Sequence, residues 1–112
     1  MTKRLDPVHP GEVLQEEFLK PMGVSAYKLA KGIGVSQPTI GAILKKERGV
    51  TADMALLLGK FLGTSAEFWT NLQGHYSLEI ARDRMRSRLA EVSRIVSKKA
   101  KAKPPARLGG RD

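Results

Sequence analysis

The sequence of 112 residues contains no cysteine, only two histidines and few aromatic residues, namely one Trp, two Tyr and three Phe. The lack of cysteine excludes disulfides, cysteine-based zinc sites and thiol catalysis. The longest apolar run covers residues 54–58, which is far too short to cross a membrane, and no apolar segment of the signal-peptide kind follows the basic N-terminus. With 41% hydrophobic and 28% charged residues, the composition is that of one small globular domain. We therefore expect a cytoplasmic protein without a membrane segment.

Acidic residues are also scarce, with 11 Asp and Glu against 20 Lys and Arg, and the net charge of +9 is unevenly distributed. Residues 1–64 carry nine basic and six acidic side chains, residues 65–81 carry two acidic ones, and residues 82–112 carry eleven basic and three acidic ones. The excess predicts a polyanion as the first partner to test, with an anionic membrane surface as the weaker alternative. Residues 99–112, rich in Lys and containing Pro-Pro and Gly-Gly, are predicted to be a disordered basic tail.

Residues 9–76 read as short helices with clear ends and no strand-like alternation, preceded by an N-terminal arm at residues 1–8. Four helices are expected at 10–20, 26–33, 37–46 and 52–62. Their start signals are Pro10 at the first helical position and the caps Ser25, Ser36 and Thr51, and their stop signals include Pro21, Gly23, Gly34 and Gly63. Thr64 and Glu67 suggest a capping box for a fifth helix.

A longer amphipathic helix is expected at residues 77–98. Its apolar residues recur at spacings of three and four: Leu78, Ala81, Met85, Leu89, Val92 and Val96. Arginines cover most of its other faces. The narrow apolar stripe has no partner within its own segment, so it must pack back on the five-helix body, pair with a second copy of the chain or bind another protein.

Two consecutive short helices, each opened by a serine and joined through Gly34, match the helix-turn-helix arrangement. The glycine permits a tight turn, and the small Ala30 lets the two helices approach closely. In this arrangement the second helix presents its N-terminal residues to the major groove of DNA. The motif thus predicts that residues 37–46 form a recognition helix.

The predicted DNA-binding residues lie on and beside this helix pair. Gln37 can make a bidentate contact to adenine, and Thr39 can touch a thymine methyl group or a phosphate. Lysines and arginine nearby can bind phosphates, which fixes the register without reading sequence. The full predicted set is Ser25, Lys28, Ser36, Gln37, Pro38, Thr39, Lys45, Lys46 and Arg48.

The sequence resembles the HigA/VapI-type antitoxins within the Xre-like helix-turn-helix regulators. The resemblance covers residues 9 to about 76 and rests on His9-Pro10-Gly11-Glu12, the helix-turn-helix, residues 51–55 and residues 63–73. It implies an all-α, five-helix fold similar to that of lambda repressor, here followed by the C-terminal amphipathic helix. It also implies a homodimer that binds and neutralises a ribonuclease toxin similar to HigB and represses their shared operon by binding a pseudo-palindromic operator.

Dimerisation would let two recognition helices read two half-sites about one helical turn apart. The apolar residues predicted to form the dimer interface are Phe68, Trp69, Leu72, Leu78, Met85 and Leu89. Two alternatives remain open. One is an orphan Xre-type regulator without a toxin, and the other is an architectural protein that binds DNA without sequence preference through its basic C-terminal region.

No combination of residues predicts a nucleophile, an acid–base pair, a metal site or a cofactor site, so we do not expect an enzyme. His9 beside Pro10 is more typical of helix capping or surface structure than of a metal ligand. The three glutamates of the first helix, Glu12, Glu16 and Glu17, favour interaction with the helix dipole over acid–base chemistry.

Overall fold

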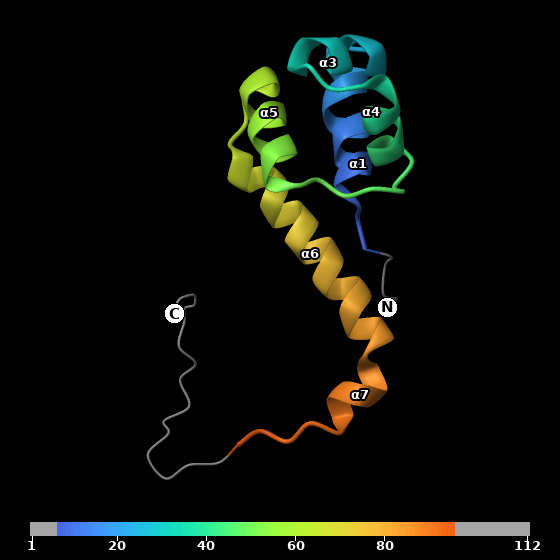
Figure 1. Ribbon diagram of the computed structural model, residues 1–112, viewed down its shortest axis with the longest axis vertical. Coiled ribbons are helices and arrows are strands. Elements are labelled where there is room, and N and C mark those ends of the chain that lie inside the picture. The colour runs from blue at the N-terminus through green and yellow to red at the C-terminus, as the bar shows by residue number, and fades with distance from the viewer. Residues whose placement is uncertain (1–6, 96–112) are drawn as a thin grey trace.

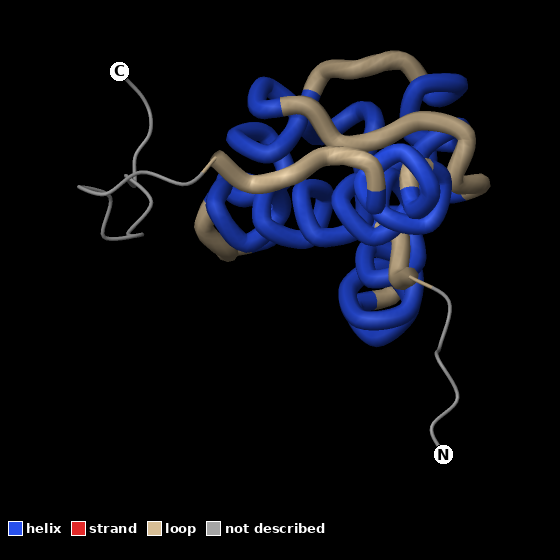
Figure 2. Tube along the Cα trace, turned by 90° about the horizontal axis from the view of Figure 1, so that it is seen from below, coloured by secondary structure: helices blue, strands red, loops and turns tan. Residues whose placement is uncertain are grey.

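The computed structural model describes residues 7–95, and within this range the chain forms helices joined by loops, with no strand (Figures 1 and 2). The predicted all-α fold is confirmed. The predicted disorder of residues 99–112 and most of the predicted arm at 1–8 lie outside the described residues. The elements are α1 Pro10–Val13, the π-helical segment η1 Leu14–Leu19, α2 Lys20–Met22, α3 Ala26–Ile33, α4 Gln37–Leu44, α5 Ala52–Leu62, α6 Ala66–Arg84 and α7 Arg86–Ala90.

The first three elements follow one another without a break and form one helical rod. The prediction that Pro21 lies beyond the end of this helix is wrong, because Pro21 is within α2 and the rod ends at Gly23, which has a φ of 67°. A proline inside a helix lacks an N–H and crowds the carbonyl group one turn earlier. The wide turn of η1 precedes it, and there the Lys20 N–H donates to the Gln15 carbonyl, five residues back. This wider spacing lets the rod continue through the proline.

The caps predicted for α3, α4 and α5 are confirmed. The Ser25 hydroxyl oxygen accepts a hydrogen bond from the Lys28 N–H at 3.0 Å, and Thr51 accepts one from the Met54 N–H at 3.1 Å. Each cap satisfies a backbone donor that has no partner within its helix. These side chains fix where the helices of the body begin.

The predicted capping box at Thr64 is wrong by one residue. Ser65 caps α6 by accepting the Phe68 N–H at 3.0 Å. The Thr64 hydroxyl instead accepts the Trp69 indole N–H at 2.8 Å and donates to the Ser65 carbonyl at 3.2 Å. A buried indole N–H requires an acceptor, and Thr64 provides it.

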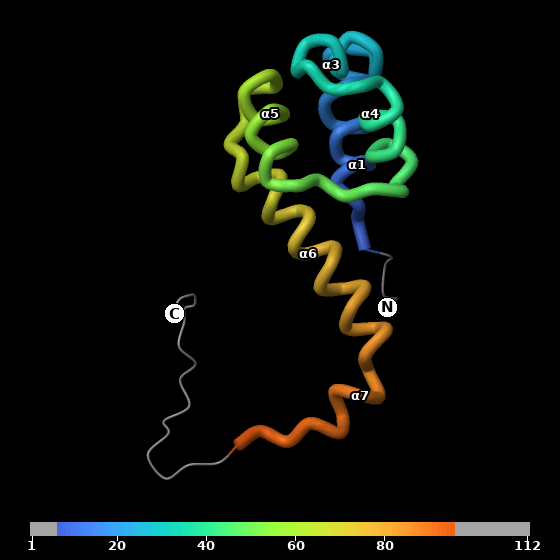
Figure 3. Tube along the Cα trace, in the orientation of Figure 1, coloured from blue at the N-terminus to red at the C-terminus, as the bar shows by residue number. Residues whose placement is uncertain are grey.

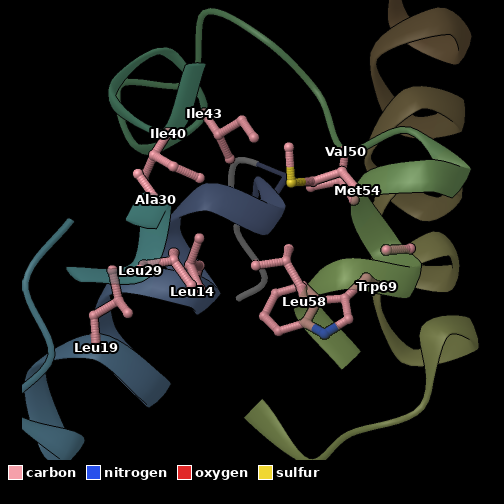
Figure 4. Close-up of a cluster of buried hydrophobic side chains, with 11 residues drawn as sticks. Leu14, Leu19, Leu29, Ala30, Ile40, Ile43, Val50, Met54, Leu58 and Trp69 are labelled. Atoms are coloured by element: carbon pink, nitrogen blue, oxygen red, sulfur yellow. The ribbon is translucent and has the colours of Figure 1, made fainter. Parts of the chain in front are cut away.

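The core is formed by apolar side chains from the helical rod, from α3 to α6 and from the loop before α5 (Figure 4). Its buried members are Leu14, Leu19, Leu29, Ala30, Ile40, Ile43, Val50, Met54, Ala55, Leu58 and Trp69. Removing this apolar surface from water is the main favourable contribution to folding. We refer to residues 9–76, which contain the whole core, as the body.

The predicted separation between a fifth helix and a helix at 77–98 is also wrong. Helix α6 runs from Ala66 to Arg84 without interruption, ends at Met85, and is followed by the short α7. Residues 91–95 are not helical, so residues 75–98 do not form one continuous helix. Figure 1 shows α6 beginning beside α5 and extending away from the other helices, with α7 beyond its end. We call residues 77–95 the arm.

The apolar stripe of the arm does not pack back on the body. Leu78 is 54% exposed, Leu89 is 50% exposed and Val92 is 68% exposed. Val96, the last predicted member of the stripe, lies outside the described residues. Packing of the stripe on the body is thereby excluded for the described part of the arm. Pairing with a second copy of the chain and binding to another protein remain as alternatives.

Candidate nucleic-acid interface

Helices α3 and α4 are joined by a turn of three residues. Gly34 ends α3 with a φ of 72°, in the left-handed region that favours glycine, and the next amide, that of Val35, donates to the Ala30 carbonyl at 3.0 Å. Ala30 and Ile40 are both buried between the two helices and the rest of the core. The predicted helix-turn-helix geometry is therefore present, and it fixes the direction of α4 relative to α3.

The first turn of α4 carries the predicted base-contacting residues. Ser36 caps the helix by accepting the Thr39 N–H at 3.2 Å, and the hydroxyl groups of Ser36 and Thr39 lie 2.8 Å apart and share a hydrogen bond. Gln37 and Pro38 are exposed, whereas Thr39 is half-buried. Because the Thr39 hydroxyl is already hydrogen-bonded within the protein, the exposed Gln37 amide is the stronger candidate for reading a base edge.

The predicted phosphate-binding residues fall into two groups. Ser25 and Lys28 lie at the start of α3, on the first turn of the helix that precedes the recognition helix. Lys45, Lys46 and Arg48 lie at the other end of α4, in the loop to α5, and all three are exposed. The structure thus places cationic side chains near both ends of the helix pair.

The loop at residues 45–51, which we call the basic loop, is fixed by contacts that the sequence analysis did not identify. Lys46 has a φ of 66°, and its ammonium nitrogen lies 3.6 Å from a carboxylate oxygen of Glu12 in α1. Farther along, the Val50 N–H donates to the side-chain carbonyl oxygen of Gln73 in α6 at 2.7 Å. One signal in the sequence pointed to Gln73: it follows Trp69 by one helical turn and therefore shares its face of α6.

The predicted dimer interface needs one correction. Trp69 is fully buried in the core of the body, where its ring packs against that of Phe18 with centroids 5.3 Å apart. It cannot contact a second copy unless the core opens. Phe68, in contrast, is 38% exposed, and Leu72 is half-buried. Together with the arm residues Leu78, Met85 and Leu89, these two remain available for an interface.

His9 caps α1, in agreement with the prediction of helix capping at this residue. Its Nδ1 accepts the Gly11 N–H at 2.8 Å, and its ring packs edge-on against Tyr76 of α6 with centroids 4.8 Å apart. The side chain is buried. Burial lowers the pKa of His9 below its ordinary value, the positive charge of Lys46 lowers it further, and Glu12 partly opposes the shift. This histidine is a structural cap.

Other kinds of site have no support among residues 7–95. No group of three or more His, Cys, Asp or Glu side chains in this range is placed to hold a metal ion. No helix within it is both long enough and apolar enough to span a membrane. The capped helix pair, the exposed first turn of α4 and the basic loop together define a DNA-binding protein of the helix-turn-helix class.

Comparison with known proteins agrees with this class. The helix-turn-helix family pattern matches residues 16–69. Virulence-associated protein I of Dichelobacter nodosus is 50% identical over 74 residues, which cover 66% of this chain and 68% of that protein. Antitoxin HigA-1 of Vibrio cholerae serotype O1 is 42% identical over 84 residues, covering 74% and 77% of the two chains. The structure of Pseudomonas aeruginosa antitoxin HigA with the higBA promoter superposes with a TM-score of 0.78 at 42% identity, covering 80% of this chain and 99% of that one.

The chain belongs to the HigA/VapI-type family of Xre-like helix-turn-helix antitoxins. It is accordingly a DNA-binding regulator of the HigA type and not an enzyme.

Proposed function

We propose that this protein is the antitoxin of a toxin–antitoxin pair, that it acts in the cytoplasm as a homodimer, and that it represses its own operon by binding a pseudo-palindromic operator. The observation that supports operator binding is the exposed first turn of α4, held by the Ser36 cap with Gln37 outward. The HigA of P. aeruginosa, similar over 80% of this chain, has been solved with promoter DNA.

A mobility shift tests sequence-specific binding directly. The double variant Gln37→Ala, Thr39→Ala should lose about 1–3 kcal/mol of operator affinity per half-site and little affinity for random DNA. Asn71→Ala is a matched control, because it removes an exposed amide from α6 instead of α4. Undiminished discrimination between the protein's own promoter and random DNA in the double variant would contradict base reading by α4.

Dimerisation is proposed to use the arm. One recognition helix covers only a few base pairs, so a second copy is needed to read an operator of useful length. The arm extends from the body, and its leucines at positions 78 and 89 are about half exposed, which is costly in water. Pairing two arms would bury both stripes and place the two bodies on either side of a twofold axis.

Sedimentation of a charged variant tests the arm. Leu78→Asp with Leu89→Asp should convert the dimer to a monomer and weaken operator binding. Leu56→Asp is the matched control, because Leu56 is 62% exposed on α5, outside the arm. A monomer caused by the control, with a dimer retained by the arm variant, would place the interface on α5 instead.

The toxin is proposed from family membership. We expect a short gene beside this one that encodes a small basic ribonuclease similar to HigB. The two products, expressed together with a tag on one of them, should co-purify, and this protein should restore growth of cells that express the toxin. Failure on both counts would favour the alternative of an orphan regulator.

The uneven charge supports a second candidate, an architectural protein that binds DNA through its C-terminal region, because residues 82–112 carry eleven basic and three acidic side chains. In that case, deleting residues 99–112 should remove most of the affinity and flatten its salt dependence. Under our proposal the same deletion lowers affinity for random DNA while discrimination for the operator is retained.

A further inference from the structure

The basic loop connects α4 to α5, and Figure 3 shows it running past the N-terminal end of α1 on its way to α5. Its first part is tied to α4, because the amides of Lys45, Lys46 and Glu47 donate to the carbonyls of Gly41, Ile43 and Ala42 at 2.9–3.0 Å. Arg48 and Gly49 follow, where the chain has left the helix. The path of this second part must be determined by contacts outside α4.

Gln73 supplies such a contact from α6. Its side-chain oxygen accepts the Val50 N–H at 2.7 Å, the shortest hydrogen bond among those of the described side chains, and its amide nitrogen donates to the Ser77 hydroxyl at 3.1 Å. The two hydrogen bonds agree on the orientation of the amide, with the oxygen accepting from the loop and the nitrogen donating to Ser77. Val50 itself is buried in the core, which holds the donor in place.

The backbone of the loop fits closely against the same amide. A methyl group added at Gly49 would lie 2.7 Å from the Gln73 side-chain oxygen and 2.9 Å from its amide carbon. No real Cβ approaches another atom so closely, so a side chain at position 49 would displace the Gln73 amide. The loop and Gln73 therefore match in shape as well as in hydrogen bonding.

We propose that Gln73 is a positioning residue for DNA binding, which holds the basic loop so that its cationic side chains meet the phosphate backbone. This inference rests on the proposed contact between the loop and DNA. Gln73 lies outside the helix-turn-helix and has no role in reading bases. It acts through the Val50 amide, which it fixes two residues beyond Arg48.

A phosphate-positioning role predicts a specific pattern in DNA binding. Phosphate contacts carry no sequence information, so Gln73→Leu should weaken binding to the operator and to random DNA by the same factor, about tenfold. The slope of log affinity against log salt should become shallower by about one to two, because fewer counterions are released. The ratio of the two affinities should not change. A general loss of stability would not give this combination, since it would not alter the salt slope of the folded fraction.

Gly49→Ala provides a second route to the same defect without altering Gln73. It displaces the amide and should reproduce the shared loss of affinity and the shallower salt slope. Ser77→Ala is the matched control, because it removes the other hydrogen bond of the amide while leaving the Val50 bond possible; its affinity should stay within about twofold of the unmodified protein. Hydrogen exchange at the Val50 amide should accelerate at least about tenfold in Gln73→Leu and in Gly49→Ala, while amides within α3 and α4 keep their protection.

The double variant Lys45→Ala, Arg48→Ala separates failure of this inference from failure of the proposed loop contact. If that variant loses affinity while Gln73→Leu and Gly49→Ala bind with unchanged affinity and slope, the positioning role is overturned and the loop contact stands. If the double variant itself binds both DNAs normally, the loop does not contact DNA and both ideas are overturned. A selective loss of operator discrimination in Gln73→Leu would also overturn the inference, because it would place Gln73 in base recognition.

Discussion

The body and the arm differ in how their helices begin and in how much of their apolar surface is buried. In the body, each of the helices α3 to α6 begins at a side-chain cap, and η1, α4 and α5 each carry fully buried apolar residues, namely Leu14, Ile40 and Leu58 among others. In the arm, α7 begins without a side-chain cap, none of residues 77–95 is fully buried, and Leu78, Leu89 and Val92 are half exposed or more. The body can therefore fold on its own contacts, whereas the arm becomes well buried only when a partner covers it.

Ion pairs do not compensate for the lack of buried apolar surface in the arm. The arm has two ion pairs at i,i+3 spacing, Arg82–Glu79 at 3.0 Å and Arg86–Asp83 at 2.9 Å. Their arginine side chains are 59% and 75% exposed, and pairs of this kind contribute only a few tenths of a kcal/mol. Such pairs favour helix in the arm but cannot replace a core. The exposed apolar residues of the arm, which its ion pairs do not cover, support its proposed role in pairing with a second copy.

The largest expected effect comes from truncating a leucine in each region. Leu58→Ala should reduce the free energy of unfolding by about 2–5 kcal/mol, because Leu58 is fully buried and its loss leaves a cavity. The matched change Leu78→Ala should cost about 0.5 kcal/mol or less in dilute, monomeric protein. Urea unfolding followed by the fluorescence of Trp69, the single tryptophan of the chain, measures both.

Repeating the unfolding measurements at several protein concentrations separates the two leucines further. If the arm pairs with a second copy, the cost of Leu78→Ala should grow as the protein concentration is raised above the dissociation constant of the dimer, whereas the cost of Leu58→Ala should stay constant. Equal costs for the two variants in monomeric protein would contradict the distinction between body and arm.

Single glycines give the next largest effect. Gly34→Ala should destabilise the body by about 1–2 kcal/mol, because an alanine there must adopt the left-handed conformation that ends α3. Gly74→Ala, near the junction with the arm, should stabilise the protein by about 0.5–1 kcal/mol, because Gly74 lies inside α6 and the added Cβ would enter open space. Thermal or urea unfolding measures the two opposite signs, and a destabilising Gly74→Ala would show that α6 is not continuous through this position.

Features governed by local chemistry could be predicted from the sequence. The serine and threonine caps of α3, α4 and α5 and the glycine stops at positions 34 and 63 were all correct, because a cap and its target amide lie within three residues of each other. The helix-turn-helix and the exposure of Gln37 followed from these signals. The sequence was thus sufficient to predict the helix-turn-helix and its exposed recognition residue.

Features that depend on distant partners could not be predicted in this way. The Gln73 hydrogen bond joins residues 23 apart, and nothing near Val50 indicates it. Trp69 was assigned to the interface as one of the apolar residues of its helix, and only its full burial and its packing against Phe18 show that it faces the core. Pro21 looked like a helix end, but the π turn before it lets the helix continue. A separate helix was expected from residue 77, but α6 continues through Gly74 in spite of the low helix propensity of glycine.

The smallest expected effect concerns pH, and it connects the two regions because His9 packs on Tyr76 where α6 leaves the body. The pKa of His9 is lowered in the folded protein, first by burial and then by Lys46. The unfolded chain therefore binds more protons than the folded one just below pH 6.5, the ordinary value. Stability contributed by neutral His9 should be fully present above that pH and should fall as the pH is lowered through this window. Protonation would also remove the acceptor of the Gly11 N–H.

Urea unfolding at several pH values between about 5.5 and 7.5 tests this effect, with His9→Asn as the informative variant. Asparagine can still cap α1 but does not titrate, so the variant should lose most of the pH dependence in this range while the helix start is preserved. His75→Gln is the matched control: His75 is exposed, and its replacement should leave the pH dependence intact. If the free energy of unfolding depends on pH in the same way in the unmodified protein and in His9→Asn, protonation of His9 does not affect stability.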